Sequence, residues 1–333
     1  MTRTLVVGGT GFLGAAIAAC AVARGQQVCI LTRGQTKAAA GVTAIFADRF
    51  APLTALQGQS FDLVFDTCAD VPDAVTHLLR VVTPQRYVMI SSISVHPQFD
   101  DPNLSEAASV PTATEADLSP YHARDFANWG RVQMKSESYG PLKRACELAA
   151  IAALGDKAIL LRAGLLVGAG DCCDRLTWWA RRIDQGGPIP VPTDRKIQCI
   201  DVRDVADFAV KLAAEGGAGI YNVTGQPFAL FSLLKTLQAL SGTPSTLAPL
   251  PDQAFVDADV GPWMNLPLWL PDDPEHRYFF DITTARARAA GLTTRPLDRT
   301  LRPLLDRDRG RRKIALATGL TAAQEAALLA DQP

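Results

Sequence analysis

A glycine-rich turn near the amino terminus constrains the fold of this chain more than any other feature. The apolar run "TLVVG" (4–8) leads into "GTGFLG" (9–14). A G-x-G-x-x-G pattern between a strand and a helix is typical of a βαβ unit that binds a dinucleotide, because glycine lets the backbone approach a pyrophosphate and lets the helix pack on the strand. The free N–H groups and the dipole of the helix N-terminus favour phosphate there. The predicted cofactor-binding residues of this turn are Gly8, Gly11, Phe12, Leu13 and Gly14. The alternative is a tight turn without a ligand.

The residues after the second strand bear on which dinucleotide binds. An acid that grips a ribose 2′-hydroxyl is expected there, but the chain has Thr32 and Arg33. A guanidinium suits a 2′-phosphate, so NADP is preferred over NAD; the alternative is a solvated arginine at a loop start. Asp48 follows the third strand, where its carboxylate would accept from an adenine amino group. The predicted cofactor contacts also include Arg49 and Cys68.

The first half of the chain alternates apolar runs with helical patterns. Strands are expected at 4–8, 27–32, 42–47, 61–67, 86–92, 158–164 and 219–225, with a helix from Phe12 to Arg24 closed by Gly25. Strands that are apolar throughout and joined by helices predict an α/β fold with a Rossmann-type, doubly wound parallel sheet. We expect a dinucleotide-binding domain at 1–165 and a smaller, mixed substrate-binding domain at 166–333, from which the strand near 219–225 returns to the sheet. Residues 97–137 form a long loop that is either a lid or an insertion.

A tyrosine and a lysine stand four residues apart in "SYGPLK", as Tyr139 and Lys143. The segment from Ser138 is helix-like, and a spacing of four places both side chains on one face. A fixed ammonium beside a phenol favours the phenolate and makes it a useful proton donor and acceptor. The alternative is an exposed pair on a surface helix.

Together with the glycine turn and "ISSISVH" (90–96), this pair resembles the extended or atypical short-chain dehydrogenase/reductases, the NAD-dependent epimerase/dehydratase group. The resemblance covers most of the chain and implies a Ser–Tyr–Lys site. Ser92 takes the serine position, with Ser94 as the fallback, Tyr139 is the acid/base, and Lys143 binds the nicotinamide ribose and tunes Tyr139. Family members often pair helices into homodimers, which this sequence leaves open.

Departures from the family pattern bear on the substrate. His96 stands where tyrosine is common, as a loop residue or a substrate contact, and "LRAGLLVGAGD" lacks the asparagine typical of members that hold nucleotide sugars. This set of motifs as a whole is more similar to the bacterial branch of the family that is likened to isoflavone reductases. Trp178, Trp263 and Trp269 are candidates for an apolar substrate pocket, with packing as the alternative.

Composition excludes several classes of function. The net charge is −1 and no apolar run approaches a membrane span, so neither nucleic acid nor membrane is an expected partner. Seven cysteines and no leader-like segment suit a cytoplasmic protein with reduced thiols, and no metal site is expected. We predict an NADP-dependent oxidoreductase that reduces a carbonyl or enone of a small, fairly apolar molecule. The alternatives are an epimerase or dehydratase with transiently reduced bound cofactor and a non-catalytic nucleotide-binding scaffold.

Overall fold

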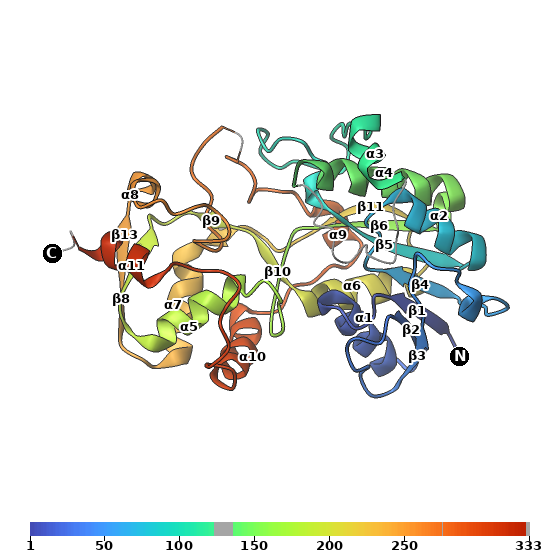
Figure 1. Cartoon of the computed structure of the whole chain (residues 1–333), viewed down its shortest axis with the longest axis horizontal. Coiled ribbons are helices and arrows are strands. Elements are labelled where there is room, and N and C mark those ends of the chain that lie inside the picture. Colours follow the sequence, from blue (N-terminus) through green and yellow to red (C-terminus); the bar gives the residue numbers. More distant parts are fainter. Residues whose placement is uncertain (123–135, 275, 331–333) are drawn as a thin grey trace.

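A parallel sheet of seven strands forms the larger of two lobes (Figure 1). The computed structural model describes residues 1–122, 136–274 and 276–330. The strand order is β11-β6-β5-β4-β1-β2-β3, and every neighbouring pair is parallel. The strands are β1 (Arg3–Val7), β2 (Gln27–Thr32), β3 (Val42–Phe46), β4 (Leu63–Asp66), β5 (Arg86–Ser92), β6 (Ala158–Ala163) and β11 (Gly219–Val223). The Rossmann-type α/β fold expected from the sequence is therefore confirmed.

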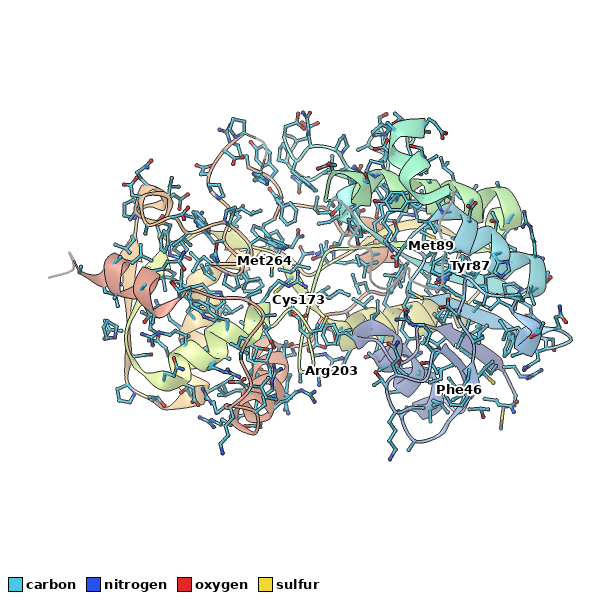
Figure 2. The ribbon with its side chains drawn as sticks, viewed as in Figure 1. Phe46, Tyr87, Met89, Cys173, Arg203 and Met264 are labelled. Carbon is cyan, nitrogen blue, oxygen red and sulfur yellow. The ribbon has the colours of Figure 1, made fainter. Side chains whose placement is uncertain are left out.

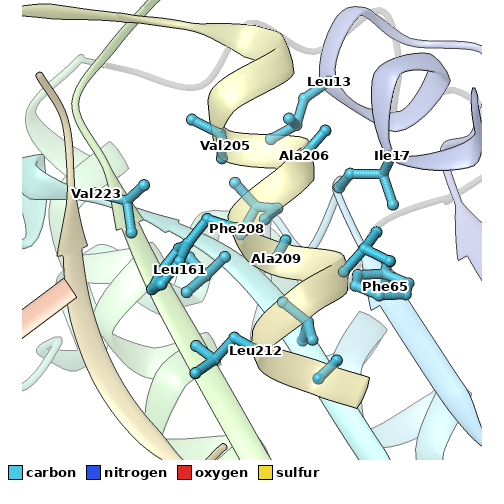
Figure 3. Close-up of a cluster of buried hydrophobic side chains, with 14 of the residues drawn as sticks. Leu13, Ile17, Phe65, Leu161, Val205, Ala206, Phe208, Ala209, Leu212 and Val223 are labelled. Atoms are coloured by element: carbon cyan, nitrogen blue, oxygen red, sulfur yellow. The ribbon is translucent and has the colours of Figure 1, made fainter. Parts of the chain in front are cut away.

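Helices cover both faces of this sheet. On one face, α1 (Phe12–Ala23) and α6 (Val202–Ala214) pack against each other and the strands, with Leu13 and Ile17 of α1 near Ala206 of α6 (Figure 3). The other face is covered by α2 (Pro72–Val81) and α4 (Ser136–Leu154). Successive strand residues point to opposite faces of the sheet. Because helices cover both faces, every position of β4 is buried. This two-sided burial explains why the strands are apolar throughout.

The smaller lobe has its own core, built on Trp179, Leu234, Phe255 and Trp269. Its elements are β7 (Leu165–Val167), α5 (Arg175–Gln185), β8 (Gly187–Pro192), β9 (Lys196–Ile197), β10 (Cys199–Asp201), β12 (Phe228–Ala229), α7 (Leu230–Ser241), β13 (Ser245–Leu250), α8 (Asp252–Asp257), α10 (Leu297–Arg309) and α11 (Ala322–Leu329). In α11, Thr321 and Gln324 form a capping box. Among the described residues, no helix is both long and apolar enough to cross a membrane.

The second half of the chain is shared between the lobes more extensively than the sequence indicated. The expected strand does return, as β11, but α6 and the short α9 (Ala285–Ala289) also join the core of the larger lobe. The reason is that the face of the sheet beside α1 needs a second covering helix, which α6 supplies.

The segment expected to be one long loop, 97–137, contains structure of its own. Helix α3 (Glu115–His122) lies within it, and Thr114 donates its backbone N–H to Asp117 at the start of that helix. Leu104 bridges to Ile282, and Asn222 of β11 donates its backbone N–H to Glu106. The first part of the segment is thus fastened to the larger lobe, while residues 123–135 lie outside the described residues.

Candidate functional site

The glycine turn borders a cavity of about 390 Å³ at the carboxyl ends of β1, β2, β3 and β4. Gly8 has φ of 78°, a left-handed conformation that favours glycine. A Cβ on Gly14 would lie 2.2 Å from the carbonyl oxygen of Gly8, so a side chain there would push α1 away from the turn. The cavity is lined by Val7, Gly8, Thr10, Gly11, Leu31, Thr32, Arg33, Gln35, Thr36, Ala47, Asp48, Arg49, Phe50, Thr67, Cys68 and Asp70. Its position at the C-terminal edge of a doubly wound sheet is where such folds bind ligands.

The N-terminus of α1 opens toward this turn without a side-chain cap. Gly11 is the N-cap residue and supplies no side-chain acceptor, and the first helical N–H bond is that of Ala15 to the Gly11 carbonyl. The N–H groups of Phe12 and Leu13 at this end have no acceptor within the helix, so they could donate to the oxygens of a pyrophosphate. The Phe12 ring itself lies against Gly168 and Gly170, in the loop that enters the smaller lobe.

That loop continues to Cys172 and Cys173, and Cys173 lies where the two lobes meet (Figure 2). The two thiols and the carboxylate of Asp171 come within 4.8 Å of one another. Arg175 already stands 3.7 Å from the Asp171 carboxylate, and its positive charge opposes a cation at this place. No metal site is assigned to this cluster.

At the far end of the cavity, Arg33 lines the wall with an exposed guanidinium that has no hydrogen-bond partner among the described residues. Thr32 is buried and its hydroxyl accepts the N–H of Gly34. Asp48 accepts the N–H of Phe50 through Oδ1. An unpaired guanidinium in the wall of such a cavity could pair with a 2′-phosphate. This role of Arg33 remains a prediction.

Arg49 differs from the other predicted cofactor residues because its guanidinium turns into the core. It donates to both carboxylate oxygens of Asp66, at 2.6 and 2.8 Å, and to the carbonyl oxygens of Cys68 and Ala74. Tyr87 donates its hydroxyl to the same carboxylate, at 2.8 Å. These bonds offset the burial of Asp66 and hold the pKa of its carboxyl below the usual range. The geometry thus gives Arg49 a structural role and orders the Cys68 segment of the wall.

The predicted acid/base helix meets the predicted serine loop at Gly140. A Cβ on Gly140 would lie 2.0 Å from the carbonyl oxygen of Ser94, so only glycine lets the first turn of α4 rest directly on 93–95. This contact holds the turn of α4 that carries the half-buried Tyr139 against the loop that follows Ser92 at the end of β5. The Ser92 hydroxyl accepts the N–H of Ser94 at 3.1 Å. Its own O–H proton therefore stays available to a substrate oxygen.

Lys143 lies on the same face of α4, with Nζ 5.8 Å from the centre of the Tyr139 ring. The lysine is buried, and burial by itself lowers its pKa. The charges of Asp70 and Tyr139 outweigh that effect and raise the pKa above the ordinary value. Asp70 was not among the residues singled out from the sequence, and the only signal for it there is its place after the fourth strand.

Beneath this pair, Glu147 anchors a buried network that sequence reasoning also missed. Glu147 accepts from Arg162 twice at 2.9 Å, from Ser91 at 2.7 Å and from Arg144 at 2.9 Å.

His96 is 3% exposed, and its Nε2 has no hydrogen-bond partner among the described residues. Burial and the charge of Arg162 lower the pKa of His96 to about 4, so the ring is neutral near neutral pH.

The three predicted pocket tryptophans separate in the structure. Trp269 is 1% exposed and donates Nε1 to Asp252, which places it in the core of the smaller lobe. Trp178 is buried against Gly319 and stacks edge-on with Trp179. Only Trp263 remains half-buried, in contact with Phe279 and Phe280. Packing thus accounts for Trp269, whereas Trp178 also lines a cavity of about 460 Å³ together with Met264 and Asn265.

Comparisons with known proteins agree with this geometry. Residues 4–89, which form the glycine turn and the strands around it, match the model of the NAD dependent epimerase/dehydratase family. The match begins in β1 and ends within β5, so it covers the amino-terminal part of the sheet and not α4 or the smaller lobe. Over this segment the chain is similar to NAD(P)-binding enzymes of the epimerase/dehydratase type, and the match does not show the isoflavone-reductase branch.

Solved structures of epimerase/dehydratase proteins share the whole fold. A putative epimerase from Burkholderia cenocepacia is 20% identical over 93% of this chain and 98% of its own, with a TM-score of 0.65. The enzyme WbmH from Bordetella bronchiseptica, solved with NAD⁺, is 16% identical over 93% and 99%, with a TM-score of 0.64. UDP-N-acetylglucosamine 4-epimerase from Bacillus cereus is 15% identical over 92% and 98%, with a TM-score of 0.63. No curated protein matches the chain in sequence.

Proposed function

We propose that this enzyme catalyses an epimerase- or dehydratase-type reaction, in which a secondary alcohol of a small molecule is oxidised and the hydride returns within the same cycle. The observation that supports this proposal is that Lys143 lies beside Tyr139 and reaches Asp70 in the wall of the cavity, while α4 rests on the loop that follows Ser92. A bound NAD(P) would supply the acceptor and donor of hydride. Because the cofactor is regenerated in each cycle, it need not leave.

The chain's own residues provide the proton chemistry. Tyr139 takes the alcohol proton as the carbonyl forms and returns it later, and Ser92 donates a hydrogen bond to that oxygen throughout. Gly8, Gly11 and the open N-terminus of α1 hold the pyrophosphate. The family match, and the likeness in fold to epimerases and to a dehydratase, favour this reaction class over simple reduction.

Arg33 supports a second candidate, the NADP-dependent reduction of a carbonyl or enone on a fairly apolar molecule. Its unpaired guanidinium in the cavity wall suits a 2′-phosphate, and NADP commonly serves as an exchanging reductant. Trp263 with its phenylalanine neighbours provides apolar surface for such a substrate. In this reaction Tyr139 would donate the proton to the product alkoxide, and Ser92 would donate a hydrogen bond to the same oxygen.

Purification followed by release of bound nucleotide separates these functions. Tightly held NAD(H) is expected for the epimerase or dehydratase, freely exchanging NADP(H) for the reductase, and a protein that binds neither would be a scaffold. Turnover is then followed with UDP-glucose for the first arm and with 9,10-phenanthrenequinone for the second. Tyr139→Phe should abolish turnover in whichever arm is active while dinucleotide affinity stays nearly unchanged. Full activity of this variant would remove Tyr139 from the reaction.

A further inference from the structure

The ammonium of Lys143 has used all of its donors inside the protein. Its Nζ donates to the Ala69 carbonyl at 2.9 Å, to Asp70 Oδ1 at 3.1 Å and to the Ile90 carbonyl at 3.5 Å. An ammonium has three N–H groups, so these acceptors saturate it. The side chain is 6% exposed, and its charge is therefore poorly screened by water.

Asp70 stands between this ammonium and the cavity. It belongs to the segment 67–70 after β4, which is fastened to the glycine turn by the bond from Thr67 N to the Val7 carbonyl. The Asp70 side chain is 31% exposed and lines the cavity, whereas Lys143 does not line it. One carboxylate oxygen faces Lys143, so the group that a bound ligand meets here is a carboxylate backed by an ammonium.

We propose that Asp70 is the counter-charge of Lys143 within the dinucleotide site and sets the balance between oxidised and reduced cofactor. This rests on the proposed function, in which the nicotinamide end lies beside Tyr139 and Lys143. The oxidised ring is cationic and the reduced ring is neutral, so an unpaired ammonium nearby favours the reduced form, and an unpaired carboxylate favours the oxidised form. A pair cancels both effects, which suits a reaction in which the cofactor must accept a hydride and return it.

The test measures the ratio of the dissociation constants of NAD⁺ and NADH, and likewise of NADP⁺ and NADPH, by fluorescence or calorimetry. Asp70→Asn is expected to raise the oxidised-to-reduced ratio about fivefold or more, since Lys143 is then unpaired. Lys143→Met is expected to lower the ratio, since Asp70 is then unpaired. The double variant should return close to the wild-type ratio.

Asp73→Asn is the matched control, because it removes the same charge three residues away on the exposed surface of α2, and its ratio should not move. Ratios that are unchanged in both single variants, or that move in the same direction, would overturn the role of Asp70. A wild-type protein that binds none of the four nucleotides would instead defeat the proposed function itself. Shifts of the ratio in opposite directions for Asp70→Asn and Lys143→Met distinguish an electrostatic effect from a merely structural one.

Discussion

The carboxylate of Asp66 and the guanidinium of Arg49 form a bidentate ion pair at the carboxyl edge of the sheet, with both groups buried. Asp66 ends β4, and Arg49 lies in the connection that follows β3. The pair ties these two parts of the cavity wall together. Because Arg49 is paired with Asp66, its guanidinium is not free to bind a ligand, although the residue lines the cavity.

Removal of one member of this pair should destabilise the fold strongly. Arg49→Met leaves the Asp66 carboxylate buried without its cation, a change that costs about 3–5 kcal/mol in the free energy of unfolding. Urea denaturation measures it. Arg299→Met is the control, since that arginine is 78% exposed and its contact with Asp298 spans 4.0 Å; such surface pairs contribute about 0–1 kcal/mol. A loss below about 1 kcal/mol for Arg49→Met would refute the structural role.

A methyl group at Gly140 should separate the two halves of the proposed catalytic site. Gly140→Ala would place a Cβ 2.0 Å from the Ser94 carbonyl oxygen, so α4 must shift away from 93–95 and carry Tyr139 away from Ser92. We expect turnover to fall by about 100-fold or more while dinucleotide affinity changes little. Steady-state kinetics and a binding titration check this.

Gly310→Ala provides the comparison for Gly140→Ala. Its added Cβ would meet its nearest neighbour, the Arg307 carbonyl oxygen, at an ordinary 3.4 Å in helical backbone. Turnover of this variant should match the wild type. Equal activity of the Gly140 and Gly310 variants would show that the close approach of α4 to 93–95 is unimportant.

His96 should make the fold sensitive to acid. Its pKa is lowered to about 4 by burial and by Arg162, against about 6.5 for an unfolded histidine. Between pH 6.5 and 4 the unfolded chain therefore binds a proton that the folded chain does not, so stability falls as the pH falls through this window and levels off below it. The full contribution is about 3 kcal/mol at most.

The free energy of unfolding of His96→Gln, measured from pH 7 to pH 4, should decline less steeply than that of the wild type. Identical slopes for the two proteins would mean that His96 titrates normally when folded. His77→Gln is the control, because it makes the same replacement at a histidine whose ring bonds the Ala51 carbonyl in an exposed contact.

Arg33 decides cofactor preference if a 2′-phosphate binds in the cavity. Arg33→Ala should weaken NADPH binding by about 10- to 100-fold, the value of a charge-assisted hydrogen bond, and leave NADH binding nearly unchanged. Parallel titrations with both nucleotides measure the preference. Arg80→Ala removes an exposed charge from α2, far along the sequence from the cavity wall, and should alter neither affinity. Equal losses for NADH and NADPH would point to a general charge effect.

Local patterns were sufficient to predict most of the secondary structure of the larger lobe. The expected strands at 27–32, 42–47 and 86–92 agree with β2, β3 and β5 within one residue, and the expected helix at 12–24 agrees with α1, followed by Gly25 with φ of 74°. Apolar runs, glycine and capping residues act over a few neighbouring positions, so the sequence carries them directly. The same holds for Tyr139 and Lys143, because a helix places residues four apart on one face.

Charge partners were decided only by the tertiary structure. Arg49 finds Asp66 across 17 positions and Lys143 finds Asp70 across 73, and no local pattern relates those residues. Burial likewise separated Trp263 from Trp269, although the two share one sequence segment. The sequence by itself determined the strands, the glycine turn and the proton-transfer spacing, because these depend on neighbours along the chain. Only the folded packing decided which charges are paired, since it brings distant residues together out of water, where an unpaired charge is costly.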